Sequence, residues 1–71
     1  MSSVVNVDPE ILGGTPVFMG TRVPVESLFD HLKHGHSIEY FLHDFPSVSR
    51  EQVEALLDEA KSKTLPNTPA A

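Results

Sequence analysis

Cysteine is missing from this chain of 71 residues, and basic side chains are scarce. Without cysteine, neither a disulfide framework nor a thiolate metal site can stabilise the fold. No apolar run approaches the roughly 18 residues of a membrane span, and nothing resembles a signal peptide, so we expect no membrane segment and a cytoplasmic location. A core of this size rarely contributes more than about 3–5 kcal/mol, so a homodimer or a stable partner is expected.

The shortage of positive charge limits any nucleic-acid function. Five Lys and Arg residues stand against ten Asp and Glu residues, which gives a net charge of −5. Non-specific binding to nucleic acid depends on cations that neutralise phosphates. Double-stranded DNA would therefore have to be contacted by a few well-placed residues, and an acidic surface is equally consistent with a basic protein partner.

What the chain does contain is a change of pattern at Pro24. A β segment over residues 4–19 precedes it, with a glycine turn between two short β-prone runs. Three stripes with i, i+3, i+4, i+7 spacing follow, and they predict helices at about 24–34, 38–45 and 50–62. The sequence thus predicts a mainly α fold with three helices and a short N-terminal β ribbon, forming one domain over residues 1–63 and a disordered tail over 64–71.

Capping residues support these boundaries. Gly35 is suited to the position after the first helix, where a positive φ is usual. Ser37 is placed to cap the second helix, and Ser49 with Gln52 forms a capping-box pattern at the start of the third. The connections between the helices are therefore short.

The ribbon carries the residues that we predict to bind a protein partner. An isolated two-stranded ribbon is marginal in water, so it either packs on the helices or continues into a second subunit through an apolar edge at Val17, Phe18 and Met19. Arg22, beside a glycine turn, suits a carboxylate, a phosphate or a partner's C-terminus. The alternative is an internal salt bridge, for example to Glu26.

The last two predicted helices and the turn between them resemble a helix-turn-helix unit. In such a unit the second helix enters the major groove, which makes Ser47, Ser49, Arg50 and Gln52 the candidate DNA-binding residues. Acidic side chains on the same helix would face the phosphates unfavourably. The alternative is a packing unit of three helices that never touches DNA.

Other chemistry has weaker support. A metal site using His31, His34 and His36 is geometrically conceivable, but solvated histidines at a helix end are the simpler interpretation. The glycine turns match no phosphate-binding or dinucleotide motif, so no cofactor is predicted. No nucleophile, acid–base pair or catalytic residue stands in a recognisable context, and we do not expect an enzyme.

Several blocks together resemble the small bacterial domain-of-unknown-function family numbered 433. The resemblance covers residues 4–60 and is carried by DPEILGGTPV at 8–17, GTRVPV at 20–25, GHSIE at 35–39, FP at 45–46 and SREQV at 49–53. It implies a homeodomain-like helix-turn-helix fold with a preceding β segment. It also implies an antitoxin that neutralises a nuclease-like toxin of the PIN type and represses the shared operon. The alternative function is a protein-interaction and dimerisation module without DNA binding.

Overall fold

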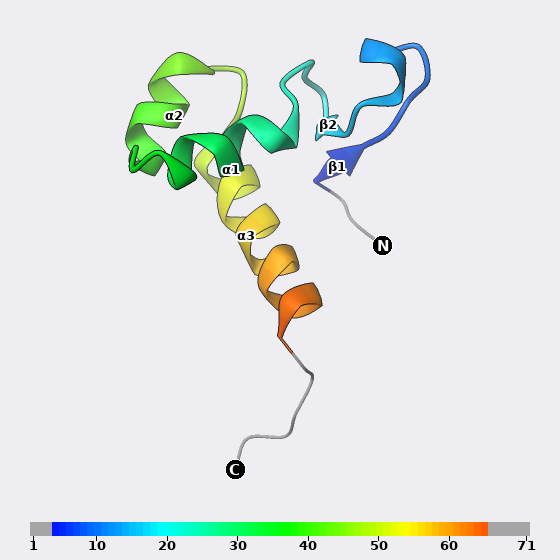
Figure 1. Ribbon diagram of the computed structural model, residues 1–71. Helices are drawn as coiled ribbons and strands as arrows, with labels where there is room; N and C mark the ends of the chain where they lie inside the picture. Colours follow the sequence, from blue (N-terminus) through cyan, green and yellow to red (C-terminus); the bar gives the residue numbers. More distant parts are fainter. Residues whose placement is uncertain (1–3, 66–71) are drawn as a thin grey trace.

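A computed structural model describes residues 4–65 and shows a mainly helical fold with a small antiparallel sheet (Figure 1). The order of elements is β1 (Val5–Asn6), a 3₁₀ turn η1 (Leu12–Gly14), β2 (Val17–Phe18), α1 (Val25–Lys33), α2 (Ile38–Asp44) and α3 (Arg50–Thr64). The ribbon lies beside the beginning of α1, and α3 extends away from the body as a stalk. The three helices lie close to the predicted ranges.

One hydrophobic core joins the ribbon to all three helices. Its fully buried side chains come from β2, α1, α2 and α3, namely Phe18, Leu28, Phe41 and Val53. The rings of Phe18 and Phe41 lie 6.0 Å apart and tie β2 to α2. Because a two-stranded ribbon is marginal alone, this shared core is what holds it in place.

The strand β2 has backbone partners along both edges. Val5 pairs with Phe18 and Asn6 with Val17 on one side. On the other side Val17 bridges Pro24, and the Phe18 N–H donates to the carbonyl of Val23 at 2.9 Å. The prediction of an exposed apolar edge is therefore wrong for Val17 and Phe18, because both side chains are fully buried and Phe18 packs in the chain's own core.

The helix ends follow the predicted capping chemistry. Ser37 accepts a hydrogen bond from the Tyr40 N–H at 3.0 Å at the start of α2. Ser49 and Gln52 form the complete capping box of α3. Gly35 has φ +85°, and the N–H of His36 reaches back to the carbonyl of His31, which closes α1 in a Schellman motif.

The end of α3 differs from its prediction. The helix continues to Thr64, which the sequence placed in the tail. Leu65 follows as the C-cap of the helix, and residues 66–71 of the predicted tail lie outside the described residues. A membrane-crossing helix is absent from residues 4–65, since none of the three combines the needed length with enough hydropathy.

Candidate functional site

Two turns that lead into helices carry the residues predicted to bind partners and DNA. The first, called the 19–22 turn, comprises Met19 to Arg22, follows β2 and precedes α1. The 46–49 turn, residues 46–49, joins α2 to α3. Arg22 is the last residue of the first turn, and Arg50 directly follows the second. These two arginines have very different surroundings.

The 19–22 turn is built from short local hydrogen bonds. Both the N–H and the hydroxyl of Thr21 donate to the carbonyl of Phe18, at 2.9 and 2.8 Å. Gly20 adopts φ +78°, the conformation that the third position of a type II turn requires. The Thr21 hydroxyl in turn accepts from the Val23 N–H at 3.0 Å. The turn therefore presents Met19 and Arg22 from a well-defined backbone.

Met19 and Arg22 are the members of the predicted partner set that stay on the surface. Met19 is 43% exposed, whereas Val17 and Phe18 are fully buried. Arg22 is exposed and forms no ion pair with any acidic side chain within residues 4–65, including Glu26. The internal salt bridge considered from the sequence is thus not formed, and the guanidinium faces solvent.

Arg50, at the start of α3, is held by two carboxylates. It forms a short ion pair with Glu39 of α2, and its Nη1 lies 3.7 Å from a carboxylate oxygen of Glu54. The backbone N–H of Glu39 itself and then the Arg50 guanidinium lower the pKa of the Glu39 carboxyl. The hydrogen bond that Arg50 donates to Glu39, followed by the charge of that carboxylate, raises the pKa of Arg50. This cation is therefore already partnered within the chain.

Gln52 connects the two turns. Its Oε1 accepts from the Ser49 N–H at 3.0 Å, as the capping box requires. Its Nε2 donates to the carbonyl of Met19 at 2.9 Å, across 33 residues of sequence. The side-chain amide predicted to contact DNA bases thus has both ends engaged in positioning the 19–22 turn on α3.

The other predicted DNA-binding residues are two serines of the 46–49 turn. The Ser49 hydroxyl accepts from the Gln52 N–H at 3.1 Å and is part of the helix cap. Ser47 is exposed. The turn itself is closed by the Val48 N–H on the carbonyl of Phe45 at 3.0 Å, with the Val48 side chain buried. Ser47, Ser49 and Arg50 of the predicted DNA set are all exposed, but Ser49 and Arg50 already have partners within the chain.

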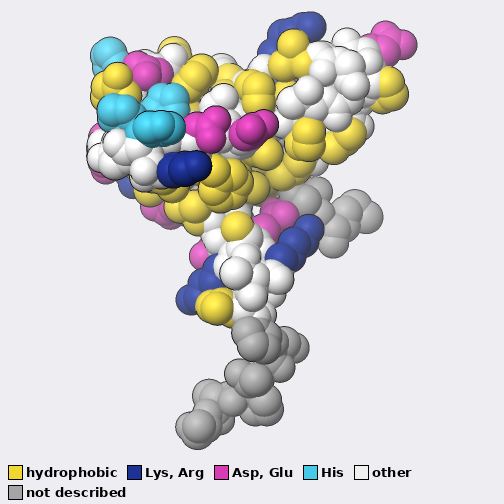
Figure 2. Space-filling model, in the orientation of Figure 1, with side chains coloured by type: hydrophobic (Ala, Val, Ile, Leu, Met, Phe, Trp, Pro, Cys, Tyr) yellow, Lys and Arg dark blue, Asp and Glu magenta, His cyan; other side chains and the backbone are white. Residues whose placement is uncertain are grey.

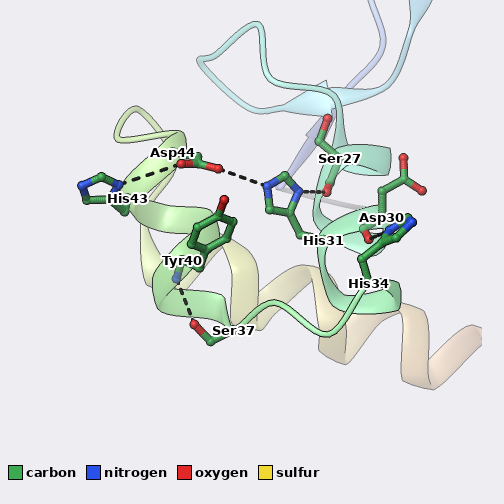
Figure 3. A network of polar contacts seen from close by, with 8 residues as sticks. All are labelled: Ser27, Asp30, His31, His34, Ser37, Tyr40, His43 and Asp44. Atoms are coloured by element: carbon green, nitrogen blue, oxygen red, sulfur yellow. Dashed lines mark hydrogen bonds and ion pairs between the residues drawn. The ribbon is translucent and has the colours of Figure 1, made fainter.

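Figure 3 shows His31 between α1 and α2, with His34 and His43 to either side of it. His31 Nδ1 lies 2.8 Å from the Ser27 carbonyl, and its Nε2 lies 3.3 Å from Asp44 Oδ2. His34 Nδ1 lies 2.7 Å from the carbonyl of Asp30. Among residues 4–65, no three His, Cys, Asp or Glu side chains converge as a metal site would need. The structure brings His31 into a packing cluster instead.

Aromatic contacts explain that cluster. The His36 ring stacks on Tyr40 with centroids 4.4 Å apart, and the His31 ring meets the edges of Phe41 and Phe45 at 5.3 and 5.6 Å. His31 therefore acts as a half-buried aromatic spacer between the two helices. Sequence reasoning missed this role and missed Glu39 as the partner of Arg50, since neither follows from spacing along one helix.

Comparisons with known proteins are consistent with this fold. The pattern of the family described as "Protein of unknown function (DUF433)" matches residues 5–60. An uncharacterised protein of Sinorhizobium fredii (strain NBRC 101917 / NGR234), y4eO, is 46% identical over 50 residues, which are 70% of this chain and 23% of that protein. The chain thus spans less than a quarter of that relative.

A solved structure shares the architecture. The crystal structure of a DUF433 member from Anabaena variabilis ATCC 29413 at 2.00 Å resolution superposes with a TM-score of 0.69 at 23% sequence identity. The superposition covers 80% of this chain and 56% of the other. At this identity the likeness supports the fold alone.

Proposed function

The chain belongs to the DUF433 family of proteins of unknown function, and on that premise we propose that it is an antitoxin-like regulator. It binds a nuclease-like toxin of the PIN type in the cytoplasm, and it does so through protein contacts centred on Met19 and Arg22. Operator DNA is a second ligand, approached by the homeodomain-like unit of α2, the 46–49 turn and α3.

One observation carries the protein-binding half of this proposal. Arg22 stands on the surface without an ion-pair partner within residues 4–65, at the end of a turn fixed by Thr21 and Gln52. Because the turn fixes the backbone, binding has to order the Arg22 side chain and not the loop, and the guanidinium can meet a carboxylate in the two-pronged geometry that it prefers. Met19 adds an apolar contact beside it, as in interfaces that combine Arg and Met.

The rest of the surface favours a basic partner protein over DNA. The chain carries a net charge of −5, and Glu51, Glu54 and Asp58 are exposed on α3. A protein that binds nucleic acid presents cations to phosphates, and an acidic surface complements such cations. The same charges repel a phosphate backbone, so the proposed α3 contact with DNA is the weaker of the two interactions.

Binding of DNA through α3 would require existing contacts to be exchanged. Arg50 would have to leave Glu39 for a phosphate, and Gln52 would have to release either Ser49 or Met19. Each exchange costs part of a charge-assisted or backbone hydrogen bond. We therefore propose that operator binding depends on the complex with the toxin, in which partner cations add to the few that this chain has.

The test is a co-expression pull-down of this chain with the product of the adjacent reading frame. We expect co-purification together with loss of a nuclease activity, and we expect Arg22→Glu to abolish both. Lys33→Glu is the matched control, because it makes the same charge change at an exposed residue of α1. Retention of the toxin by the Arg22→Glu variant would contradict the proposed contact.

The DNA half needs a separate measurement. Fluorescence anisotropy with the upstream DNA fragment is expected to show weak binding by the chain alone and tighter, salt-dependent binding by the complex. Arg50→Ala should weaken DNA binding by the complex and leave toxin binding intact. Absence of binding by the complex at low salt would remove DNA from the proposed function.

The alternative is an interaction and dimerisation module without DNA binding. It is favoured by the alignment with y4eO, in which the matched region is less than a quarter of the relative. A domain that occurs within a longer protein can serve to bring chains together. Failure to find a nuclease-like partner, together with self-association of the chain, would support this second function.

A further inference from the structure

The loop that joins β1 to β2, called the 7–16 loop after its residues, contains a backbone conformation that leucine rarely adopts. Leu12 has φ +51°, in the left-handed region where the Cβ atom is crowded by the backbone. Within residues 4–65 the other residues with a positive φ are all glycines, at positions 13, 14, 20 and 35. Glycine adopts this conformation at little steric cost, so leucine at position 12 imposes a strain that glycine would avoid.

The Leu12 side chain contributes little to the fold. It is 47% exposed, and it is not one of the side chains that form the hydrophobic core of residues 4–65. The turn is closed by the backbone of Leu12, whose carbonyl accepts from the N–H and the hydroxyl of Thr15 at 3.3 and 2.8 Å. These bonds need no particular side chain at position 12. Because strained residues gather at binding sites, the leucine points to a contact outside this chain.

The backbone around Leu12 is held by consecutive turns. The Asp8 carbonyl accepts from the Ile11 N–H at 2.9 Å, and the Asp8 carboxylate accepts from the Glu10 N–H at 2.9 Å. The Ile11 carbonyl then accepts from the Gly14 N–H at 3.1 Å. Since these turns are already formed, a partner that binds Leu12 has to order little more than its side chain.

A second exposed apolar side chain and two carboxylates share the 7–16 loop. Val7 is 62% exposed and, like Leu12, is outside the core of the described residues. Asp8 and Glu10 lie between them in sequence, and neither forms an ion pair with a basic side chain of residues 4–65. Figure 2 shows hydrophobic side chains exposed at this end of the molecule, with negative charge at its edge. Such a surface complements an apolar pocket that is rimmed by Lys or Arg.

The 7–16 loop lies at the same end of the molecule as the 19–22 turn. Figure 1 shows both facing away from the far end of α3, and β2 connects them. We infer that Leu12 is an apolar anchor for a basic partner protein, which takes Leu12 and Val7 into an apolar pocket. This contact rests on the proposed function, because it belongs to the same partner that binds Met19 and Arg22.

Leu12→Asn separates binding from folding, because asparagine adopts the left-handed conformation more readily than leucine. The variant should melt at the temperature of the original chain or up to about 4 °C higher, as measured by circular dichroism. Isothermal titration calorimetry with the purified product of the adjacent reading frame should show about 10-fold weaker binding, since the apolar contact is lost. Leu12→Met keeps an apolar side chain and should bind as the original chain does.

Leu65→Asn is the matched control, because Leu65 is 53% exposed at the C-cap of α3 and should leave binding unchanged. A lower melting temperature for Leu12→Asn would show that the leucine serves the fold and would overturn the anchor. If Arg22→Glu loses the partner and Leu12→Asn binds it as tightly as the original chain, the proposed function stands and the anchor is wrong. If the original chain binds no partner, both are wrong.

The charge of the loop tests the basic rim of the pocket. Glu10 is exposed, so its replacement should not disturb the core. Glu10→Lys should weaken binding more than Glu10→Gln does, and added salt should reduce the difference, because charges at the edge of an interface are screened. Binding by Glu10→Lys that equals or exceeds that of Glu10→Gln would overturn the basic character of the partner's pocket.

Discussion

The 19–22 turn and the 46–49 turn each precede a helix and have an arginine at or next to their end, but they differ in the surroundings of that arginine. Each joins a short element to a helix and brings a cation to the surface. Arg22 has no ion-pair partner within residues 4–65, whereas Arg50 is held by Glu39 and Glu54. The first turn is therefore the better candidate for a partner, and the second serves mainly the fold.

In this small domain a single polar side chain serves both turns. Gln52 belongs to the second turn's cap but reaches Met19 in the first. One side chain thus stabilises a helix end and fixes the backbone that presents Arg22. In a chain with few polar contacts between elements, such shared use of a residue links the stability of one site to the geometry of the other.

The largest effect is expected from the strand beneath the first turn. Phe18→Ala removes a fully buried ring that contacts Phe41, which should lower the free energy of unfolding by about 3–5 kcal/mol. Because this equals the whole stability expected for such a core, the variant should be largely unfolded. Urea denaturation followed by circular dichroism measures the change.

Met19→Ala provides the control for that experiment. Met19 is 43% exposed on the same strand end, so its truncation should change stability by no more than about 0.5 kcal/mol. A stable, folded Phe18→Ala variant would mean that the ribbon is not part of the core and would restore the exposed edge predicted from sequence.

An intermediate effect is expected at the link between the two turns. Gln52→Ala loses the hydrogen bonds to Ser49 and Met19 and should cost about 1–2 kcal/mol. Gln52→Glu keeps the acceptor that the capping box needs but cannot donate to the Met19 carbonyl. It should therefore preserve the start of α3 and loosen the 19–22 turn, as amide hydrogen exchange at Thr21 would show. Equal amide exchange rates at Thr21 in both variants and in the original chain would show that Gln52 does not hold the 19–22 turn in place.

The smallest effect concerns the second turn's arginine. The pKa of Glu39 is lowered in the folded chain, first by its own backbone N–H and then by Arg50. A lowered pKa means that the contribution to stability is present above the unfolded pKa and is lost as the pH falls through the folded pKa. Arg50→Gln should raise the pKa of Glu39 partway toward its ordinary value, measured by NMR titration of the carboxyl carbon.

Lys63→Gln is the control for that titration, because Lys63 lies at the far end of α3 and should leave Glu39 unchanged. An unaltered pKa of Glu39 in the Arg50→Gln variant would show that the ion pair is not maintained in solution. In that case Arg50 would be as available as Arg22, and the difference between the two turns would disappear.

Local chemistry explains which parts of the fold could be predicted. The helix starts at Ser37 and Ser49 and the turn at Gly35 depend on residues within one helical turn, and the structure confirms each. The family resemblance is likewise confirmed over residues 5–60. The functional expectations drawn from it stay predictions.

Site residues were harder to predict because their availability depends on distant partners. Val17 and Phe18 fit an exposed edge by pattern, but Val23 and Pro24 return to cover that edge. No spacing rule relates Arg50 to Glu39 on another helix, or Gln52 to Met19 on the ribbon. Such pairs appear only once the helices have packed.

The sequence by itself determined where this protein turns and where its helices begin, since caps, glycine conformations and apolar periodicity act over a few residues. The tertiary structure decided which polar side chains remain free to act. Packing of α2 against α3 set Arg50 against Glu39, and packing of the ribbon against α3 engaged Gln52. Arg22 is without an ion pair because no carboxylate within residues 4–65 is brought within ion-pair distance of it.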